Sequence, residues 1–213
     1  MEQSWDEEYK TKWDERYEGE VYAYGKAPNV FFKEWLQHFK AGSILLPADG
    51  EGRNGVYAAM QGWAVTSFDL STAGRTKALE LAEDNQVALE YIVGDLEQLD
   101  FETGSFDAIG LIYAHFAAGK KSLFHRKLDS ALRPGGILII EAFSKKHLSL
   151  KSVDPAVGGP KDIDMLLSKE EVLADFEHYE VILLAEEEIL LNEGAHHIGK
   201  GAVVRFVGRK KAY

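Results

Sequence analysis

A short strand leads into a glycine-containing turn in the stretch Ser43-Ile44-Leu45-Leu46-Pro47-Ala48-Asp49-Gly50-Glu51-Gly52-Arg53-Asn54. Its first four residues lack the polar alternation of a half-exposed strand, which is typical of a strand buried on both faces of a parallel sheet. The pattern then becomes helical over residues 53–61. A turn of this kind brings backbone close to a ligand and points a helix N-terminus at it. A purely structural connection has the same pattern.

Strands and helices alternate after this turn. The predicted strands are 64–68, 87–93, 106–113 and 137–142, and the predicted helices are 71–84, with Ser71 as the N-cap, and 122–132. Strands that are apolar on both faces and separated by helices predict a parallel sheet covered on both sides. We therefore expect an α/β fold, a Rossmann-like doubly wound sheet.

The C-terminal part departs from this rhythm. Residues 145–164 carry two prolines and two glycines and are predicted to form a long loop, followed by a short helix over 168–176. Two β-like runs follow, 179–191 and 202–208, and the connection 192–201 is too short for a crossover helix. The last strand is therefore expected to be antiparallel.

Two helices are predicted before the first strand. Aromatic residues recur every four positions at Trp5, Tyr9, Trp13 and Tyr17, which places them on one helical stripe. This stripe either packs on the core or covers a ligand cleft as a lid. Pro28 is predicted to open a second helix that ends at residues 40–42. We expect one domain over 1–213, with a helical extension over 1–41 and a core over 42–213.

Composition excludes several classes of function. The 213 residues carry a net charge of -11, which disfavours binding of a nucleic-acid backbone. The chain has no cysteine, so disulfides, thiolate metal sites and a cysteine nucleophile are excluded. The acidic N-terminus does not resemble a signal peptide, and no apolar run is long enough to span a bilayer. The predicted location is the cytoplasm, with no membrane partner.

Acidic residues follow neighbouring predicted strands. Asp69 ends the second strand, where a carboxylate can accept both hydroxyls of a ribose. Asp95 follows the third strand, where it either accepts the adenine amino group or caps a loop. Asp49 and Glu51 lie inside the turn and would repel a pyrophosphate, yet they tolerate a ligand with a sulfonium and an ammonium. These charges favour S-adenosylmethionine over a nicotinamide dinucleotide.

The chain resembles the class I S-adenosylmethionine-dependent methyltransferases. The motifs that carry this resemblance are Gly50-Glu51-Gly52-Arg53-Asn54, Asp69, Gly94-Asp95, Phe106-Asp107 and Leu132-Arg133-Pro134-Gly135-Gly136. Within the class it is similar to the small-molecule branch of the tellurite-resistance and thiopurine methyltransferases, through Trp13-Asp14-Glu15-Arg16-Tyr17 and the segment from Tyr24-Gly25 to Pro28-Asn29. The resemblance implies a seven-stranded sheet with an antiparallel last strand. It also implies that S-adenosylmethionine is converted to S-adenosylhomocysteine in the reaction.

The resemblance and the strand ends together define the candidate cofactor-binding residues. They are Tyr24, Asp49, Gly50, Glu51, Gly52, Arg53, Asn54, Asp69, Leu70, Ser71, Asp95, Leu96, Ala114 and His115. The turn departs from the family pattern, an acid then glycine in an order like Asp-Leu-Gly-x-Gly, because Leu46 and Ala48 occupy those two places. Asp49 is the candidate replacement for the missing charge. An inactive relative is therefore one of the alternatives.

Two histidines are candidates for guiding or deprotonating the acceptor. His115 follows the fourth predicted strand at the ligand edge of the sheet, where it could equally serve as a hydrogen-bonding residue at a helix entry. His197 lies on the terminal connection next to His196. Because neighbours in extended chain point in opposite directions, this pair is a poor chelator and no metal is expected. Arg205 is a further group that could reach the cleft.

The predicted reaction is methyl transfer to a small molecule, with a thiol or a chalcogen oxyanion as the acceptor classes that need least help from a base. Two alternatives remain open at this point. One is a nicotinamide-dependent oxidoreductase, and the other is a non-catalytic relative that binds cofactor or a protein partner. Oligomeric state is not predicted by any pattern in the sequence.

Overall fold

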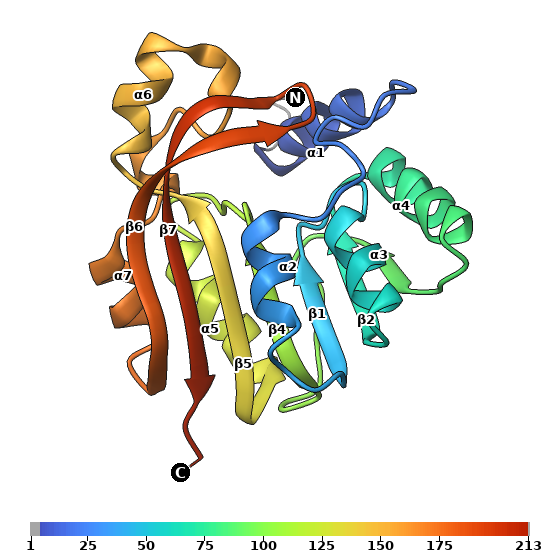
Figure 1. Ribbon diagram of the computed structural model, residues 1–213, viewed down its shortest axis with the longest axis vertical. Coiled ribbons are helices and arrows are strands. Elements are labelled where there is room, and N and C mark those ends of the chain that lie inside the picture. Colours follow the sequence, from blue (N-terminus) through green and yellow to red (C-terminus); the bar gives the residue numbers. More distant parts are fainter. Residues whose placement is uncertain (1–4, 213) are drawn as a thin grey trace.

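The computed structural model describes residues 5–212, with side chains from residue 7 onward, so the predicted packing of the Trp5 side chain lies outside it. These residues form one seven-stranded sheet in the order β3-β2-β1-β4-β5-β7-β6 (Figure 1). The strands are β1 (Ser43–Pro47), β2 (Ala64–Asp69), β3 (Glu90–Val93), β4 (Phe106–Ile112), β5 (Leu132–Phe143), β6 (Tyr179–Glu193) and β7 (His197–Lys210). β1 to β5 pair in parallel, and β7 is antiparallel to both β5 and β6. The predicted mostly parallel sheet with a reversed last strand is confirmed.

Helices cover both faces of the sheet. They are α1 (Trp5–Tyr17), α2 (Val30–Leu36), α3 (Arg53–Met60), α4 (Thr72–Asp84), α5 (Lys121–Ala131), α6 (His147–Val153) and α7 (Lys169–Asp175). Alternate residues of β1 point to opposite faces of the sheet and belong to two different hydrophobic cores. Ile44 and Leu46 pack with residues of α2 and α3, whereas Leu45 packs with residues of α5 and α7. All three side chains are essentially buried, as expected for a strand with both faces covered.

Helix ends differ in how well local sequence predicted them. Ser71 caps α4 as predicted, with its side chain accepting a hydrogen bond from the Gly74 N–H at 2.9 Å. The prediction that Pro28 opens the second helix is wrong. The N-cap of α2 is Asn29, whose Oδ1 accepts from the Phe32 N–H at 2.9 Å, and the helix ends at Leu36. A capping side chain therefore fixes the start of α2 instead of the proline.

The prediction of an irregular loop over 145–164 is wrong. This segment contains α6 and two short 3₁₀ turns, Pro155–Val157 and Ile163–Met165. Tertiary contacts hold it in place, because His147 at the start of α6 is fully buried and bonds to two distant backbone groups. Its Nδ1 accepts from the Ala202 N–H at 3.3 Å, and its Nε2 lies 3.2 Å from the Gly158 carbonyl oxygen.

The carboxyl ends of the parallel strands face a region bounded by segments that are far apart in sequence. Figure 1 shows α1, α6 and the tip of the β6–β7 hairpin gathered at this end of the sheet. The hairpin is longer than predicted, since its strands extend to Glu193 and begin again at His197. Its tip bonds to the N-terminal region through the Ala195 N–H and the Ala23 carbonyl, 3.0 Å apart.

The proposed division into a helical extension over 1–41 and a core over 42–213 stays a prediction, and the packing qualifies it. Phe32 of α2 is fully buried and belongs to the same core as Ile44 of β1. By contrast, α1 contacts α4 and lies at the ligand edge of the sheet. Over residues 5–212, no helix has the length and apolar character needed to cross a membrane.

Candidate active site

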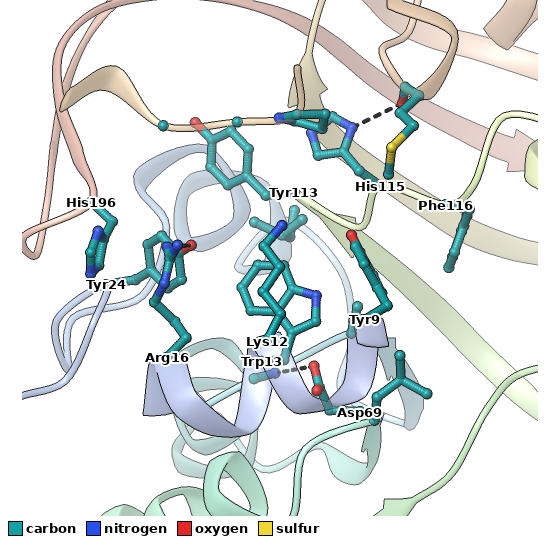
Figure 2. Close-up of a pocket in the computed structure, with 18 of the residues that line it drawn as sticks. Tyr9, Lys12, Trp13, Arg16, Tyr24, Asp69, Tyr113, His115, Phe116 and His196 are labelled. Carbon is teal, nitrogen blue, oxygen red and sulfur yellow. Dashed lines mark hydrogen bonds between the residues drawn. The ribbon is translucent and has the colours of Figure 1, made fainter. Parts of the chain in front are cut away.

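A cavity of about 750 Å³ opens at the carboxyl ends of β1, β2 and β4. Its walls come from α1, the β1–α3 turn, the β4–α5 connection, residues 155–162 and the hairpin tip. Figure 2 shows side chains of α1 on one side and Tyr113 and His115 on the other. The cavity has the size of sites that take small molecules and cofactors, which span roughly 300–1,000 Å³.

Asp69 lies at the tip of β2 beside the glycine turn. One carboxylate oxygen accepts the Gly50 N–H at 3.0 Å and the other accepts the Ser71 N–H at 2.9 Å. A carboxylate has about four lone-pair sites, so acceptor capacity remains, and its two oxygens suit the two hydroxyls of a ribose. Burial raises the pKa of Asp69 to about 6, although these backbone N–H groups act to lower it. The carboxylate that the sequence assigned to the ribose thus faces the cavity in a suitable arrangement.

The turn itself is packed closely against aromatic side chains. Gly50 has φ +56°, and a Cβ there would lie 2.6 Å from the hydroxyl of Tyr17. The hydroxyl of Tyr91 donates to the Gly50 carbonyl. Ala48, in the place where the family pattern has glycine, also has a positive φ of 53°. An alanine thus holds a backbone conformation that costs roughly 1 kcal/mol for a residue with a Cβ.

The two acids inside the turn are used by the protein itself. Asp49 accepts hydrogen bonds from the Ser67 hydroxyl at 2.8 Å and from the Gly55 N–H at 3.2 Å. Burial raises its pKa to about 7. The Glu51 carboxylate accepts the Ala23 N–H and the Lys77 ammonium, both at 2.8 Å. These acids anchor the turn and the segment before α2 through hydrogen bonds within the protein.

Most of the predicted cofactor-binding residues line the cavity. They are Tyr24, Asp49, Gly50, Glu51, Arg53, Asn54, Asp69, Leu70, Asp95, Leu96 and His115. Three of the predicted residues do not line the cavity: Gly52, Ser71 and Ala114. Asp95 also caps its own turn, since its carboxylate accepts the Glu97 N–H at 2.9 Å. The loop-capping interpretation of Asp95 therefore holds alongside its position at the cavity.

His115 lines the cavity with both ring nitrogens occupied by backbone. Nδ1 lies 3.2 Å from the Met165 carbonyl oxygen, to which it donates, and Nε2 accepts the Phe143 N–H at 3.3 Å. Burial lowers its pKa to about 3, so the ring is neutral near pH 7. These bonds tie the β4 tip to β5 and to residue 165, and they leave no free nitrogen for a substrate proton.

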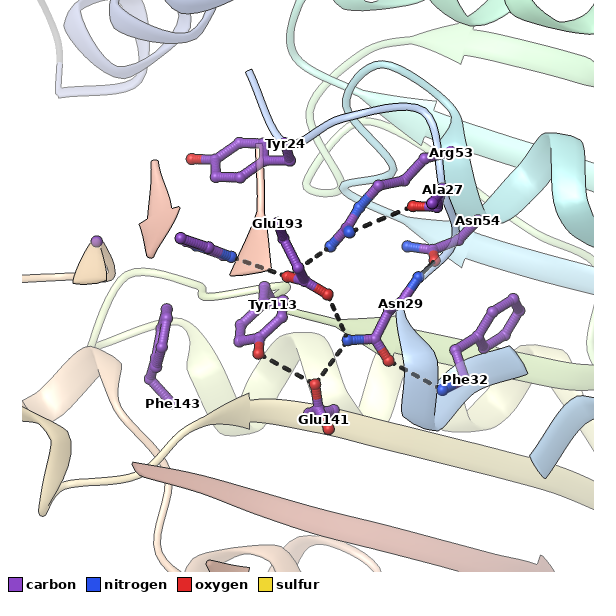
Figure 3. A network of polar contacts seen from close by, with 12 residues as sticks. Tyr24, Ala27, Asn29, Phe32, Arg53, Asn54, Tyr113, Glu141, Phe143 and Glu193 are labelled. Carbon is purple, nitrogen blue, oxygen red and sulfur yellow. Dashed lines mark hydrogen bonds and ion pairs between the residues drawn. The ribbon is translucent and has the colours of Figure 1, made fainter. Parts of the chain in front are cut away.

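His197 has a different environment. Its Nδ1 lies 3.1 Å from Oε2 of Glu193, and the same oxygen receives the Arg53 guanidinium at 3.0 Å (Figure 3). The other Glu193 oxygen accepts the Asn29 amide at 3.0 Å. Because a carboxylate only accepts, the Nδ1 of His197 carries the proton. Within the described part of the chain, Nε2 of His197 has no hydrogen-bond partner, and the residue lines the cavity.

The surroundings of Glu193 and His197 lower the pKa of both groups. Burial alone would raise the pKa of Glu193, but the His197 hydrogen bond and the Arg53 charge lower it to about 2. Burial lowers the pKa of His197, although Glu193 acts in the opposite direction. At neutral pH the pair is therefore a carboxylate and a neutral imidazole, the arrangement of a general base held by an acidic partner.

The network continues into the sheet through Glu141 of β5. Its carboxylate accepts the Asn29 amide at 2.6 Å, the Tyr113 hydroxyl at 3.0 Å and the Arg205 guanidinium at 2.7 Å. Figure 3 shows Asn29 between the two acids. Arg205 also binds Glu187 at 2.9 Å and does not line the cavity. The expectation that Arg205 reaches the cleft is therefore wrong, because the carboxylate of a neighbouring strand holds it.

Sequence reasoning missed several residues of this site. Glu193 was placed on a connection and has no motif around it. The cations Lys12, Arg16, Lys151 and Lys161 line the cavity from separate segments. Spacing along the α1 helix could have indicated the first two, since residues four apart share the aromatic face. No local signal indicates the other two.

Comparisons with known proteins agree with this geometry. Residues 47–140 match a family model described as a methyltransferase domain. A malonyl-[acyl-carrier protein] O-methyltransferase from Erwinia pyrifoliae is 32% identical over 126 residues, which are 57% of this chain and 45% of that protein. The chain spans less than half the length of the curated relatives that it matches.

Solved structures show the same architecture. One, from work on the conversion of a disulfide bond into a thioacetal group during echinomycin biosynthesis, superposes with a TM-score of 0.74 at 18% identity, over 97% of this chain and 92% of that one. TehB from Haemophilus influenzae superposes with a TM-score of 0.69 at 16% identity, over 86% of this chain and 63% of that one.

The fold and the site together define a class I methyltransferase fold, as the sequence motifs predicted. More particularly, residues 47–140 match the model of a methyltransferase domain, and S-adenosylmethionine is the cofactor that this match implies. The cavity fits that group, because a carboxylate with free acceptor capacity lies beside a glycine turn at its base. Membership of the tellurite-resistance and thiopurine branch stays a prediction.

Proposed function

We propose that this protein transfers a methyl group from S-adenosylmethionine to a small-molecule acceptor. The observation that carries the proposal is the placement of Asp69. Its buried carboxylate lies at the tip of β2, accepts the Gly50 N–H, and opens onto a cavity of about 750 Å³. This is where an α/β fold of this topology binds the ribose of an adenosine.

The residues divide into those that hold the cofactor and those that act on the acceptor. Asp69 would hold the ribose, Asp95 and Leu96 would lie near the adenine, and the turn from Asp49 to Asn54 would surround the methionine part. When bound, the cofactor supplies a methyl carbon on a sulfonium, activated for displacement. The acceptor atom bonds to this carbon as the carbon–sulfur bond breaks, and the protein contributes mainly alignment.

His197 is the proposed base for an acceptor that arrives protonated. Its Nε2 is available at the cavity while Glu193 holds Nδ1 at 3.1 Å, so a proton lost by the acceptor passes to Nε2. His115 is proposed as a positioning residue, since the Met165 and Phe143 backbone groups occupy both of its nitrogens. Of the two predicted catalytic histidines, the geometry favours His197.

A thiol or a chalcogen oxyanion is the proposed class of acceptor atom. One structural neighbour comes from work on a disulfide-to-thioacetal conversion, and another is the tellurite-resistance protein TehB. The O-methyltransferase from Erwinia acts on malonyl-[acyl-carrier protein] by its name. A screen with labelled cofactor should include tellurite, selenite, thiols, thiopurines and a free carboxylic acid.

Thermal melts test the cofactor assignment before any acceptor is known. S-adenosylhomocysteine should raise the melting temperature by mass action, whereas NAD should not. Replacing Asp69 with Ala should remove most of that increase. Asp100→Ala is the matched control, because this side chain is 95% exposed and does not line the cavity. Stabilisation by NAD, or none by S-adenosylhomocysteine, would favour the oxidoreductase or the non-binding alternative.

A further inference from the structure

Four cationic side chains line one part of the cavity. Lys12 and Arg16 come from α1, Lys151 comes from α6, and Lys161 lies between the two 3₁₀ turns. Over the side chains that the structure describes, residues 7–212, none of these four forms an ion pair with a carboxylate. Four cations without an ion-pair partner among these residues are notable in a chain whose net charge is -11, although Asp162 also lines the cavity beside Lys161.

The cluster lies away from Asp69. Figure 2 shows Lys12 and Arg16 extending from α1 toward the side of the cavity that holds Tyr113 and His196, with Asp69 below the helix. Arg16 donates to the hydroxyl of Tyr24 at 3.1 Å. Lys151, on another element, donates to the carbonyls of residues 158 and 159. Neutral oxygens therefore hold part of the cluster, and none of these contacts cancels its charge.

The cations repel one another. Burial, then the charges of Arg16 and Lys161, lower the pKa of Lys12. Burial, then the charges of Lys161, Lys12 and Arg16, lower the pKa of Lys151. Positive charge gathered in this way is unfavourable in the free protein, and an anion placed among the cations would relieve the repulsion.

The proposed cofactor does not supply that anion in full. S-adenosylmethionine carries a sulfonium, an ammonium and one carboxylate, so its net charge is positive. Its carboxylate carries a single negative charge, so it offsets no more than one of the four positive charges. The methyl acceptor, as the second ligand of the cavity, is the group that can supply further negative charge.

Aromatic side chains complete the same space. Trp13 lines the cavity beside Lys12, whose Nζ lies 5.5 Å from the indole centroid. Phe116 and Phe143 also line the cavity. Apolar walls with a few charged groups favour a ligand that has an apolar body and one polar end, because an inorganic ion gains nothing from the rings.

We infer that the methyl acceptor is an organic anion, with a carboxylate or phosphate among Lys12, Arg16, Lys151 and Lys161 and an apolar part against the aromatic walls. This inference rests on the proposed methyl transfer. Of the two proposed acceptor classes, it favours a thiol on an organic anion over an inorganic chalcogen oxyanion. It makes the charge of the acceptor, and not only its nucleophilic atom, a determinant of specificity.

Paired probes test the inference on the full chain saturated with S-adenosylhomocysteine. Titration calorimetry would compare 4-mercaptobenzoate with 4-mercaptobenzamide, and phenyl phosphate with sodium selenite. The carboxylate should bind at least about tenfold more tightly than the amide, and phenyl phosphate should exceed selenite by a similar factor. Both expectations follow from one charge contact and one apolar contact each worth about 1.4 kcal/mol.

Variants connect this preference to the cluster. The double substitution K151Q/K161Q should reduce the carboxylate-over-amide preference at least about fivefold while the affinity for S-adenosylhomocysteine changes less than twofold. Lys146→Gln is the matched control, because this neighbouring lysine pairs with Glu186 outside the cavity and is 73% exposed. It should leave every affinity unchanged.

The failures are distinguishable. Equal binding of the carboxylate and the amide to the wild-type protein overturns the inference and leaves the proposed function intact. So does a loss of S-adenosylhomocysteine affinity in K151Q/K161Q without a change in the probe preference, since the cations would then serve the cofactor. If selenite binds as tightly as phenyl phosphate, the claim that the acceptor has an apolar organic body is wrong. If the wild-type protein does not bind S-adenosylhomocysteine, the proposed function itself is wrong.

Discussion

Asp69 should make cofactor binding depend on pH in a range where few carboxylates titrate. Its pKa is raised to about 6 by burial, and only the ionised form offers an acceptor to both ribose hydroxyls while keeping the Gly50 and Ser71 bonds. Binding of the nucleoside therefore favours the ionised state. Affinity should be nearly full at pH 7 and should decline as the pH falls below about 6.

The size of the effect follows from the fraction of ionised Asp69. With a pKa of about 6, the apparent dissociation constant scales as one plus ten raised to the difference between pKa and pH. This factor is about 1.1 at pH 7 and about 11 at pH 5. We therefore expect affinity for S-adenosylhomocysteine to fall about tenfold over these two pH units, or roughly 1.4 kcal/mol.

Titration calorimetry with S-adenosylhomocysteine at pH 7, 6 and 5 measures this directly. Asp69→Asn is the control, because an amide does not titrate and the variant should bind weakly with a clearly shallower pH profile. Asp49 also titrates near neutrality, but its carboxylate bonds to Ser67 and Gly55 in the free protein, so its contribution persists in the variant. A flat profile for the wild-type protein, or an equal slope in D69N, would refute this reasoning.

Three further predictions follow from other contacts. Glu193→Gln should destabilise the fold by about 3 kcal/mol at pH 7 in urea unfolding, because Arg53 and His197 lose a buried carboxylate. Since the pKa of Glu193 falls from 4.5 to about 2 on folding, this stabilisation is present above pH 4.5 and is lost as the pH falls toward 2, so a constant difference in acid would contradict it. By nitrogen NMR, His197 should be neutral at pH 7 with its proton on Nδ1, and an Nε2-protonated ring would sink the proposed base. Gly52→Ala should cost about 2 kcal/mol or more, since φ is +78° and the new methyl would lie 2.5 Å from a Cβ of α4; Gly62→Ala, at φ +86° in open space, should cost only about 1 kcal/mol, and equal losses would disprove the packing argument.

Local periodicity explains why much of the architecture could be predicted. The strand over residues 43–46 and the capped helix after Ser71 depend on contacts within a few residues, so their signals are in the sequence. The reversed last strand followed from the length of one connection. By contrast, α6 depends on His147 meeting the Ala202 and Gly158 backbone, a contact that no local pattern reports.

The candidate site divides in the same way. Its position and the role proposed for Asp69 follow from where acidic residues end neighbouring strands. The direction in which Asp49 points does not, because its partner Ser67 lies on another strand. A motif shows which residues are near a ligand, whereas side-chain orientation depends on donors and acceptors brought together by folding.

By itself the amino-acid sequence determined the order of strands and helices from β1 to β5, the glycine turn and the acidic strand tips, since each of these depends on neighbours along the chain. Only the tertiary structure decided that Arg53 meets Glu193, that backbone occupies both nitrogens of His115, and that Lys12 and Lys161 face one cavity. The physical reason is distance along the chain. Hydrogen bonds and charge repulsion act through space, so groups separated by many residues acquire a shared function only when the sheet and its helices place them together.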